Sequence, residues 1–175
     1  WIRNTEDEAQ ETYRPLSAGK CAGGPEIGLL HSRFPQFRRE QEEDRWIEAL
    51  GKERARRPTN GCVLVSTQVA EQSVDIDADL LITDLAPTDM LLQRIGRLWR
   101  HERQRPRGAE RQVWIAAPPL DECGLRNSSA SELKKAFGKS AKVYAPYVLV
   151  RTLAEWRPRA SLLLPADMRP LLEAT

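Results

Sequence analysis

The chain has 175 residues, of which 41% are hydrophobic and 30% charged, a composition typical of one globular domain of ordinary size. No apolar run is long enough to span a membrane, so the sequence favours a soluble protein with no membrane partner. The net charge of +2 is too small to indicate a nucleic-acid partner by itself, so that question depends on where the charges lie.

The cysteines and the N-terminal residues bear on the cellular compartment. Cys21, Cys62 and Cys123 lie far apart and form no C-x-x-C pair, which favours reduced thiols in a cytosol over disulfides or a zinc site. The first residues contain no signal-peptide pattern, and the chain does not begin with Met. We therefore expect a cytoplasmic location and a fragment of a longer protein.

The first elements predicted in chain order are a strand and a helix. Residues 1–4 can form the end of a strand. Thr5 can then cap a helix that runs through Leu16, because the acidic residues of its first turn suit the positive N-terminus of a helix.

A second strand and a second helix follow. The apolar run at residues 27–31 predicts a buried strand, in which His31 is more often a structural histidine than a ligand. Ser32 and Arg33 come at the carboxyl end of this strand, and the guanidinium of Arg33 is a candidate for phosphate contact. A long helix then begins with Pro35 in its first turn.

Polar side chains follow the next predicted strand. The β-branched run at residues 61–66 is typical of a parallel strand buried on both faces. Thr67 and Gln68 come at its carboxyl end, the edge at which open α/β sheets bind ligands. Asp75 and Asp77 come a few residues later, just before the next apolar run. Together with the arginines described next, these groups predict a nucleotide site.

Residues 93–101 predict an amphipathic helix, which Thr88 or Asp89 can cap upstream. Its apolar face consists of Leu91, Ile95 and Leu98. Its opposite face consists of Gln93, Arg97 and Arg100. Guanidiniums in this register suit phosphate oxygens. Arg103 lies outside the face, so its replacement by alanine is expected to cost the longer protein little activity. The alternative is an ordinary surface helix with solvated arginines.

The rest of the chain predicts one more strand and several weaker elements. An arginine-rich connection, with seven arginines against two glutamates between Arg94 and Arg111, leads to a strand over residues 111–117. Residues 121–131 are polar and predict a loop, after which two weaker helices follow. The tail repeats a strand, a proline and a helix over residues 162–173.

The chain lacks part of what ATP chemistry requires. It contains no G-x-x-x-x-G-K-[ST] loop to cradle phosphates and no D-E-x-[DH] run to hold magnesium. It also has no His-Asp cluster able to bind metal ions, so no metal ligand is predicted. The nucleotide site predicted above therefore lacks a phosphate loop and magnesium ligands within this sequence.

Three stretches resemble motifs IV, V and VI of superfamily 2 helicases. In that order they are His31-Ser-Arg-Phe34, Thr67 with Ser-Val-Asp-Ile-Asp77, and Gln93-Arg-Ile-Gly-Arg-x-x-Arg100. The chain is similar to the CRISPR-associated helicase–nuclease of type I systems in the sequences STQVAEQSVDID, TDLAP and LLQRIGRLWRH. Most superfamily 2 proteins carry Gly where this chain has Ser73, and this departure points to the narrower family.

The resemblance implies an α/β fold, namely a RecA-like three-layer sandwich with a mostly parallel central sheet. We expect its strands near residues 1–4, 27–31, 61–66, 80–84 and 111–117. Residues 1–175 would form the second, C-terminal RecA-like helicase domain, and the first RecA-like domain and the nuclease domain would be absent from the chain. The resemblance covers nearly the whole chain, and its most specific part is residues 61–101.

The resemblance also implies an ATP-dependent helicase that translocates on single-stranded DNA and feeds a nuclease in CRISPR interference. The cofactor would be ATP with Mg²⁺, held mainly by the first RecA-like domain, so this chain alone would be inactive. Asp75 would bind the ribose, and the phosphates would be reached by the catalytic residues Gln93, Arg97 and Arg100. The DNA backbone would be contacted by Ser32, Arg33, Thr67 and Gln68. The partners would be single-stranded DNA, the first RecA-like domain, the nuclease domain and the CRISPR surveillance complex.

Two other functions remain open. The chain could belong to another superfamily 2 helicase that acts on DNA or RNA, or it could be a non-catalytic RecA-like module for DNA binding or docking, whose arginines act only by charge. The combination of Asp75 and Gln93 with two arginines favours catalysis, because charge alone would require neither an aspartate nor a glutamine.

Overall fold

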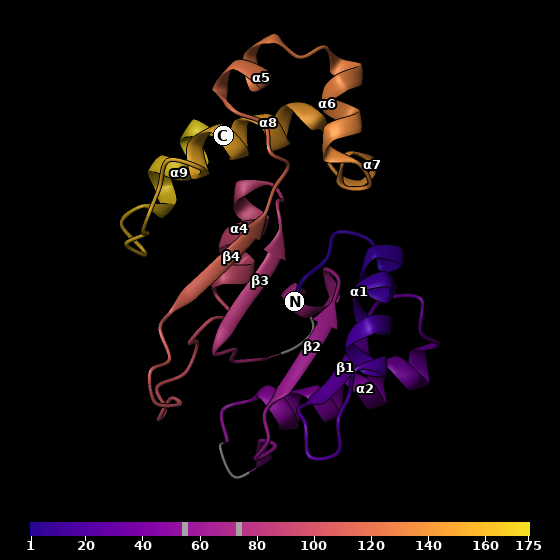
Figure 1. Ribbon diagram of the computed structural model, residues 1–175. Coiled ribbons are helices and arrows are strands. Elements are labelled where there is room, and N and C mark those ends of the chain that lie inside the picture. Colours follow the sequence, from indigo (N-terminus) through magenta and orange to yellow (C-terminus); the bar gives the residue numbers. More distant parts are fainter. Residues whose placement is uncertain (54–55, 73–74) are drawn as a thin grey trace. The chain divides into compact units, whose positions relative to one another are not determined.

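The computed structural model describes residues 1–53, 56–72 and 75–175, so Ser73 lies outside the described residues (Figure 1). Its helices and strands, in chain order, are α1 Glu6–Ala18, β1 Glu26–Leu30, α2 Gln36–Leu50, β2 Cys62–Ser66, α3 Val69–Gln72, β3 Leu80–Asp84, α4 Thr88–Ile95, β4 Gln112–Ala116, α5 Glu122–Asn127, α6 Ala130–Phe137, α7 Ser140–Val143, α8 Pro146–Trp156 and α9 Met168–Ala174. The chain divides into a first unit, Trp1–Thr83 with Arg94–Trp114, and a second unit, residues 84–93 with 115–175. Within the described residues, no helix combines the length and the apolar character that crossing a membrane requires.

Parallel strand pairing gives the first unit its α/β architecture. Strands β1 and β2 run parallel in a register that places Gly28 opposite Leu64, and β3 pairs with β4. This pairing confirms the predicted α/β class. Four strands form close to where the sequence predicted them, at residues 27–31, 61–66, 80–84 and 111–117.

The strand predicted at residues 1–4 is wrong in its extent, because it is reduced to bridges made by Ile2. Ile2 pairs in parallel with Ser66 of β2 and with Thr83 of β3. Its N–H donates to the carbonyl of Ile82 at 2.9 Å. The segment is short because the backbone bends directly afterwards to enter α1. Ile2 nevertheless joins the two strand pairs.

The start of α1 agrees with the prediction from sequence. Thr5 is the N-cap, and its hydroxyl accepts a hydrogen bond from the N–H of Glu8 at 3.3 Å. Ala9 on this helix is fully buried. Helix α2 begins at Gln36, directly after Pro35, which occupies the N-cap position.

Helix α2 packs very closely against β1. Trp46 of α2 is fully buried. A Cβ atom placed on Gly28 of β1 would lie 1.8 Å from the Trp46 ring. The strand and the helix can therefore approach this closely only because residue 28 has no side chain.

Helix α4 ends at Ile95, so the prediction that it continues to residue 101 is wrong. Beyond it the backbone turns, and Leu98 forms a parallel bridge with Ala78. The N–H of Ala78 donates to the carbonyl of Arg97 at 2.8 Å, and its carbonyl accepts from the N–H of Trp99 at 3.0 Å. Trp99 has a φ of 53°, which a right-handed helix does not contain. The carbonyl of Arg97 and the N–H of Trp99 are thus bonded to Ala78 and are not available for helical hydrogen bonds.

The second unit is mostly helical. The apolar face of α8 is buried, and the indole N–H of Trp156 donates to the hydroxyl of Thr88 at 2.9 Å. Helix α6 begins with a capping box between Ser129 and Glu132. These helices confirm the two weaker helices predicted in this part of the chain.

Two predictions for the second unit need correction. The loop predicted at residues 121–131 contains α5, because Asp121 caps it by accepting from the N–H of Gly124 at 2.7 Å. Residues 162–164, all of which the structure describes, form no strand. There the N–H of Leu163 donates to the carboxylate of Asp167 at 2.7 Å, which holds a turn instead. The final helix, α9, is confirmed.

Candidate functional site

The four residues predicted to contact DNA lie at one edge of the sheet. They are Ser32, Arg33, Thr67 and Gln68. Strands β1 and β2 are parallel, so their carboxyl ends meet there, and the N–H of Thr67 donates to the carbonyl of Leu30 at 3.2 Å. The side-chain amide of Gln68 donates to the carbonyl of Asn4 at 3.0 Å. The structure therefore brings this group together, while its role stays a prediction.

Two of these four side chains donate hydrogen bonds to acidic residues at the start of α1. The sequence did not reveal these contacts. The hydroxyl of Ser32 donates to Glu6 at 2.6 Å, and Arg33 donates to Asp7 at 2.8 Å. The hydrogen bond from Ser32 lowers the pKa of Glu6. The side chains of Arg33 and Asp7 are 56% and 58% exposed, so this ion pair contributes little stability and can exchange partners.

His31 has the structural role that its place in an apolar run predicted. Its ring is buried and stacks on Phe34, with 4.5 Å between the ring centroids. Its Nε2 lies 3.3 Å from the side-chain nitrogen of Gln10. Burial lowers the pKa of His31, so the imidazole is neutral at pH 7.

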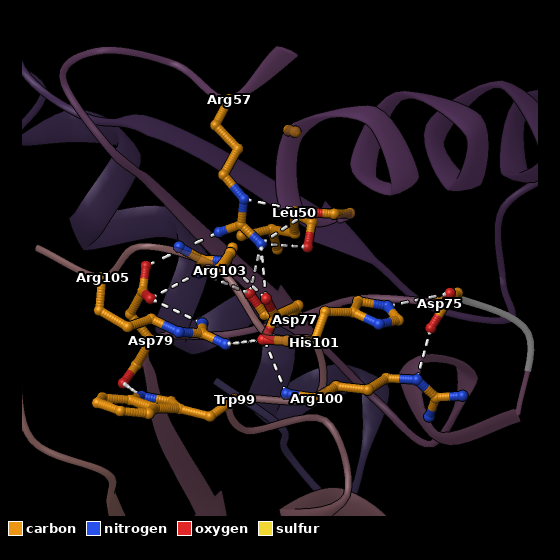
Figure 2. Close-up of polar contacts among 12 residues, drawn as sticks. Leu50, Arg57, Asp75, Asp77, Asp79, Trp99, Arg100, His101, Arg103 and Arg105 are labelled. Atoms are coloured by element: carbon orange, nitrogen blue, oxygen red, sulfur yellow. Dashed lines mark hydrogen bonds and ion pairs between the residues drawn. The ribbon is translucent and has the colours of Figure 1, made fainter. Parts of the chain in front are cut away.

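A compact group of aspartates and arginines lies within the first unit (Figure 2). We call it the acid–arginine cluster, and it consists of Arg57, Asp77, Asp79, Arg103 and Arg105. Asp77 is fully buried and accepts from Arg103 at 2.6 Å and from Arg105 at 3.0 Å. Asp79 accepts from the same two guanidiniums at 2.6 Å and 3.0 Å. Each of these guanidiniums therefore bridges both carboxylates.

Charge and burial oppose each other within the cluster. Arg57 donates to the backbone carbonyls of Leu50 at 2.7 Å and of Asp77 at 2.6 Å. Burial lowers the pKa of Arg57, and the charge of Arg103 adds to this effect. Burial would raise the pKa of Asp77, but the hydrogen bonds from Arg105 and Arg103 outweigh it and hold that pKa below its usual value. Asp77 is therefore ionised at neutral pH.

The structure gives Arg103 contacts that its position outside the predicted face did not indicate. Its side chain is only 8% exposed, and it contacts both aspartates of the cluster. Asp77 and Arg103 are 26 positions apart in the chain, so no local spacing could have indicated their contact.

Arg94 is a second residue whose place could not be predicted. It is fully buried and forms an ion pair with Glu71, with 2.6 Å between Nε and the carboxylate. It also donates to the hydroxyl of Thr83 at 2.8 Å and to the side chain of Asn4 at 3.1 Å. These contacts tie the end of α4 to α3, to β3 and to the residues before α1.

Three of the predicted nucleotide residues lie close together in the first unit. The Nε of Arg100 donates to Asp75 at 2.6 Å (Figure 2), and Arg97 donates to a backbone carbonyl of α3. Burial lowers the pKa of Arg97, and the nearby charge of Arg100 adds to this effect. Because α4 ends at Ile95, the prediction that Gln93, Arg97 and Arg100 project from one helical face is wrong. Gln93 is exposed on α4.

These groups can serve the sugar and the phosphates of a nucleotide. The carboxylate of Asp75 suits a ribose hydroxyl, and the guanidiniums of Arg97 and Arg100 suit phosphate oxygens. Among the described residues, no group of three or more His, Cys, Asp or Glu side chains is placed to hold a metal ion.

Comparison with known proteins identifies the family. The model of the family described as CRISPR-associated nuclease/helicase Cas3, C-terminal, matches residues 1–103. The chain belongs to this family. It is 42% identical over 213 residues to the CRISPR-associated endonuclease/helicase Cas3 of Thermus thermophilus, an alignment that covers 98% of this chain and 22% of that protein.

Solved Cas3 structures share the fold of this chain. The crystal structure of T. fusca Cas3-ATP matches with a TM-score of 0.84 and 38% identity, over 98% of this chain and 19% of that one. A chain of a CRISPR RNA-guided surveillance complex, pre-nicking, matches with a TM-score of 0.77 and 36% identity, over 99% of this chain and 20% of that one. These matches confirm the RecA-like α/β fold, and the chain spans about a fifth of the length of these relatives.

Proposed function

We propose that residues 1–175 are the second, C-terminal RecA-like domain of an ATP-dependent helicase that translocates on single-stranded DNA and feeds a nuclease in CRISPR interference. The observation that carries this proposal is the grouping of Arg97 and Arg100 with Asp75 in a chain of the Cas3 family. The T. fusca relative is named with ATP, which supports a nucleotide as a ligand of the longer protein.

In this proposal the grouped residues form one side of an ATP cleft. Asp75 binds the ribose, and the phosphates are reached by Gln93, Arg97 and Arg100. The first RecA-like domain supplies the phosphate loop and holds Mg²⁺. Arg100 is bound to Asp75 in this structure, so its guanidinium moves to a phosphate when the two domains close. Arginines delivered in this way stabilise charge on the transferring phosphoryl group.

The sheet edge at the ends of β1 and β2 binds the DNA backbone in this proposal. Its residues are Ser32, Arg33, Thr67 and Gln68. Such contacts need no bases, so binding is independent of sequence. The relative in a surveillance complex supports that complex as a partner, and the name endonuclease/helicase of the T. thermophilus relative supports a nuclease domain. The free cysteines are consistent with a cytoplasmic location.

The test of this function is alanine substitution of Arg97 or Arg100 in the longer protein, followed by an ATPase assay with single-stranded DNA. Each change should lower kcat strongly, since arginine fingers contribute on the order of 10³–10⁵. Lysine should rescue poorly, because it is a point charge without the planar fork. Circular dichroism should show that both alanine variants fold, because neither side chain belongs to the apolar core.

Arg107→Ala is the matched control, because Arg107 is exposed in the same arginine-rich connection. This variant should keep the kcat of the unmodified protein. If the Arg97 and Arg100 variants keep their ATPase activity and lose only DNA affinity, the chain is instead a non-catalytic DNA-binding module. Stimulation by RNA and not by DNA would favour another superfamily 2 helicase.

A further inference from the structure

Arg97 and Arg100 belong to an irregular segment. After α4 ends at Ile95, residues 97–105, all of them described, form neither a helix nor a strand apart from the bridge at Leu98. An irregular backbone can place a guanidinium accurately only when other contacts fix it. Accuracy matters here, because misplacing a catalytic group by about 1 Å can cost on the order of 10²-fold in rate.

The carboxylate of Asp77 fixes this segment at three points (Figure 2). Its Oδ1 accepts from the backbone N–H of Arg100 at 2.8 Å and from the guanidinium of Arg105 at 3.0 Å. Its Oδ2 accepts from the Nε of Arg103 at 2.6 Å. Because Asp77 is fully buried, these hydrogen bonds form without competition from water.

Neighbouring contacts restrain the residue just before Arg100. The indole N–H of Trp99 donates to the carbonyl of Asp79 at 3.0 Å, and the guanidinium of Arg105 lies over the Trp99 ring at 4.9 Å. Trp99 has a positive φ of 53°, which is costly for a bulky residue and persists only where the surroundings impose it. The backbone that leads into Arg100 is therefore held in one specific conformation.

We propose that Asp77 is a positioning residue for the nucleotide chemistry, because its buried carboxylate holds the backbone of Arg100 so that the guanidinium meets the ATP phosphates. This inference rests on the proposed function and adds a role for a residue that does not itself touch the nucleotide. Folding alone does not require such an arrangement, since apolar packing can stabilise a core as well as a buried ion pair does. An apolar side chain could not accept the hydrogen bond from the Arg100 backbone.

The experiment is Asp77→Asn in the longer protein, a change that keeps the size of the side chain and removes its charge. The kcat for ATP should fall by about 10- to 100-fold, while KM for ATP should change by less than about threefold, because the arginine acts mainly in the transition state. Asp44→Asn, at an exposed aspartate of α2, is the control and should keep the unmodified kcat. An unmodified kcat in Asp77→Asn would overturn the proposal.

A double-mutant cycle separates positioning from a general structural role. In an Arg100→Ala background, Asp77→Asn should lower kcat no further, because the guanidinium that it positions is already absent. Losses that multiply would overturn the proposal and leave Asp77 as a purely structural residue. If Arg100→Ala by itself kept full ATPase activity, the proposed function would fail instead.

A second variant keeps the test decisive if Asp77→Asn does not fold. Arg103→Lys retains the charge, but a lysine cannot bridge Asp77 and Asp79 as the guanidinium does. Its kcat should fall by about tenfold, and this loss should also disappear in the Arg100→Ala background. A lysine variant with unmodified kcat would overturn the positioning role.

Discussion

Two carboxylates at the start of α1 bind Ser32 and Arg33, the residues that the proposed function assigns to DNA phosphates. Glu6 and Asp7 offer oxygens at 2.6 Å and 2.8 Å from the two donors, much as a phosphate would. DNA must replace these oxygens in order to bind. An exposed ion pair of this kind contributes about 0–1 kcal/mol, so the exchange is possible but lowers the DNA affinity.

Removing both charges should therefore strengthen DNA binding. We expect the Glu6→Gln and Asp7→Asn double variant to bind single-stranded DNA about 3- to 10-fold more tightly than the unmodified chain, because the donors no longer face competing charges. Fluorescence anisotropy with a labelled oligonucleotide at low salt measures this difference.

A second double variant, Glu40→Gln with Asp44→Asn, controls for net charge. Both residues are exposed on α2, and the change in formal charge is the same. This control variant should raise the affinity for single-stranded DNA much less than the change at Glu6 and Asp7 does. Equal gains in the two double variants would show that only net charge matters and that Glu6 and Asp7 do not compete with DNA.

The residue types of the candidate site could be predicted from sequence, whereas their partners could not. Asp75, Arg97 and Arg100 stand in recognisable motifs, and the structure places them near one another. The contacts of Asp77 with Arg103 join residues 26 positions apart, and only the folded chain reveals them. Periodicity reports on local neighbours and is silent about such long-range pairs.

At the level of elements, helix starts were easier to predict than the end of α4. Capping depends on a few adjacent residues, and Thr5 caps α1 as expected. The end of α4 depends instead on Ala78, a strand-like partner far back in the chain. Tertiary pairing thus overrides a helical pattern that would have placed Gln93 and Arg100 on one face.

The packing of α2 on β1 should tolerate no side chain at residue 28. We expect Gly28→Ala to lower the free energy of unfolding by about 1–3 kcal/mol or more, because its Cβ would overlap the buried ring of Trp46. Urea denaturation of the chain measures this change. Gly19→Ala is the control, since Gly19 is exposed and its Cβ would meet only ordinary contacts at 3.4 Å and beyond. Equal stability of both variants would contradict the close packing.

At the level of the whole molecule, the chain provides one side of the proposed ATP site. The purified 175-residue chain should hydrolyse no ATP above background, even with single-stranded DNA, because it lacks a phosphate loop and magnesium ligands in its sequence. A phosphate-release assay tests this. The same sample should still bind DNA weakly, with an affinity that falls steeply as salt rises. Robust DNA-stimulated turnover by the chain would contradict a half-site.

The two bridges of Ile2 link the two strand pairs through one short segment, which affects how they respond to force. The N–H of Ile2 donates to Ile82 at 2.9 Å, and the N–H of Arg3 donates to Ser66 at 2.8 Å, on opposite sides of the same short segment. Because both pairings are parallel, a pull along this segment shears the bonds together and does not open them one at a time. A load applied along residues 1–3 is therefore shared at once by both strand pairs.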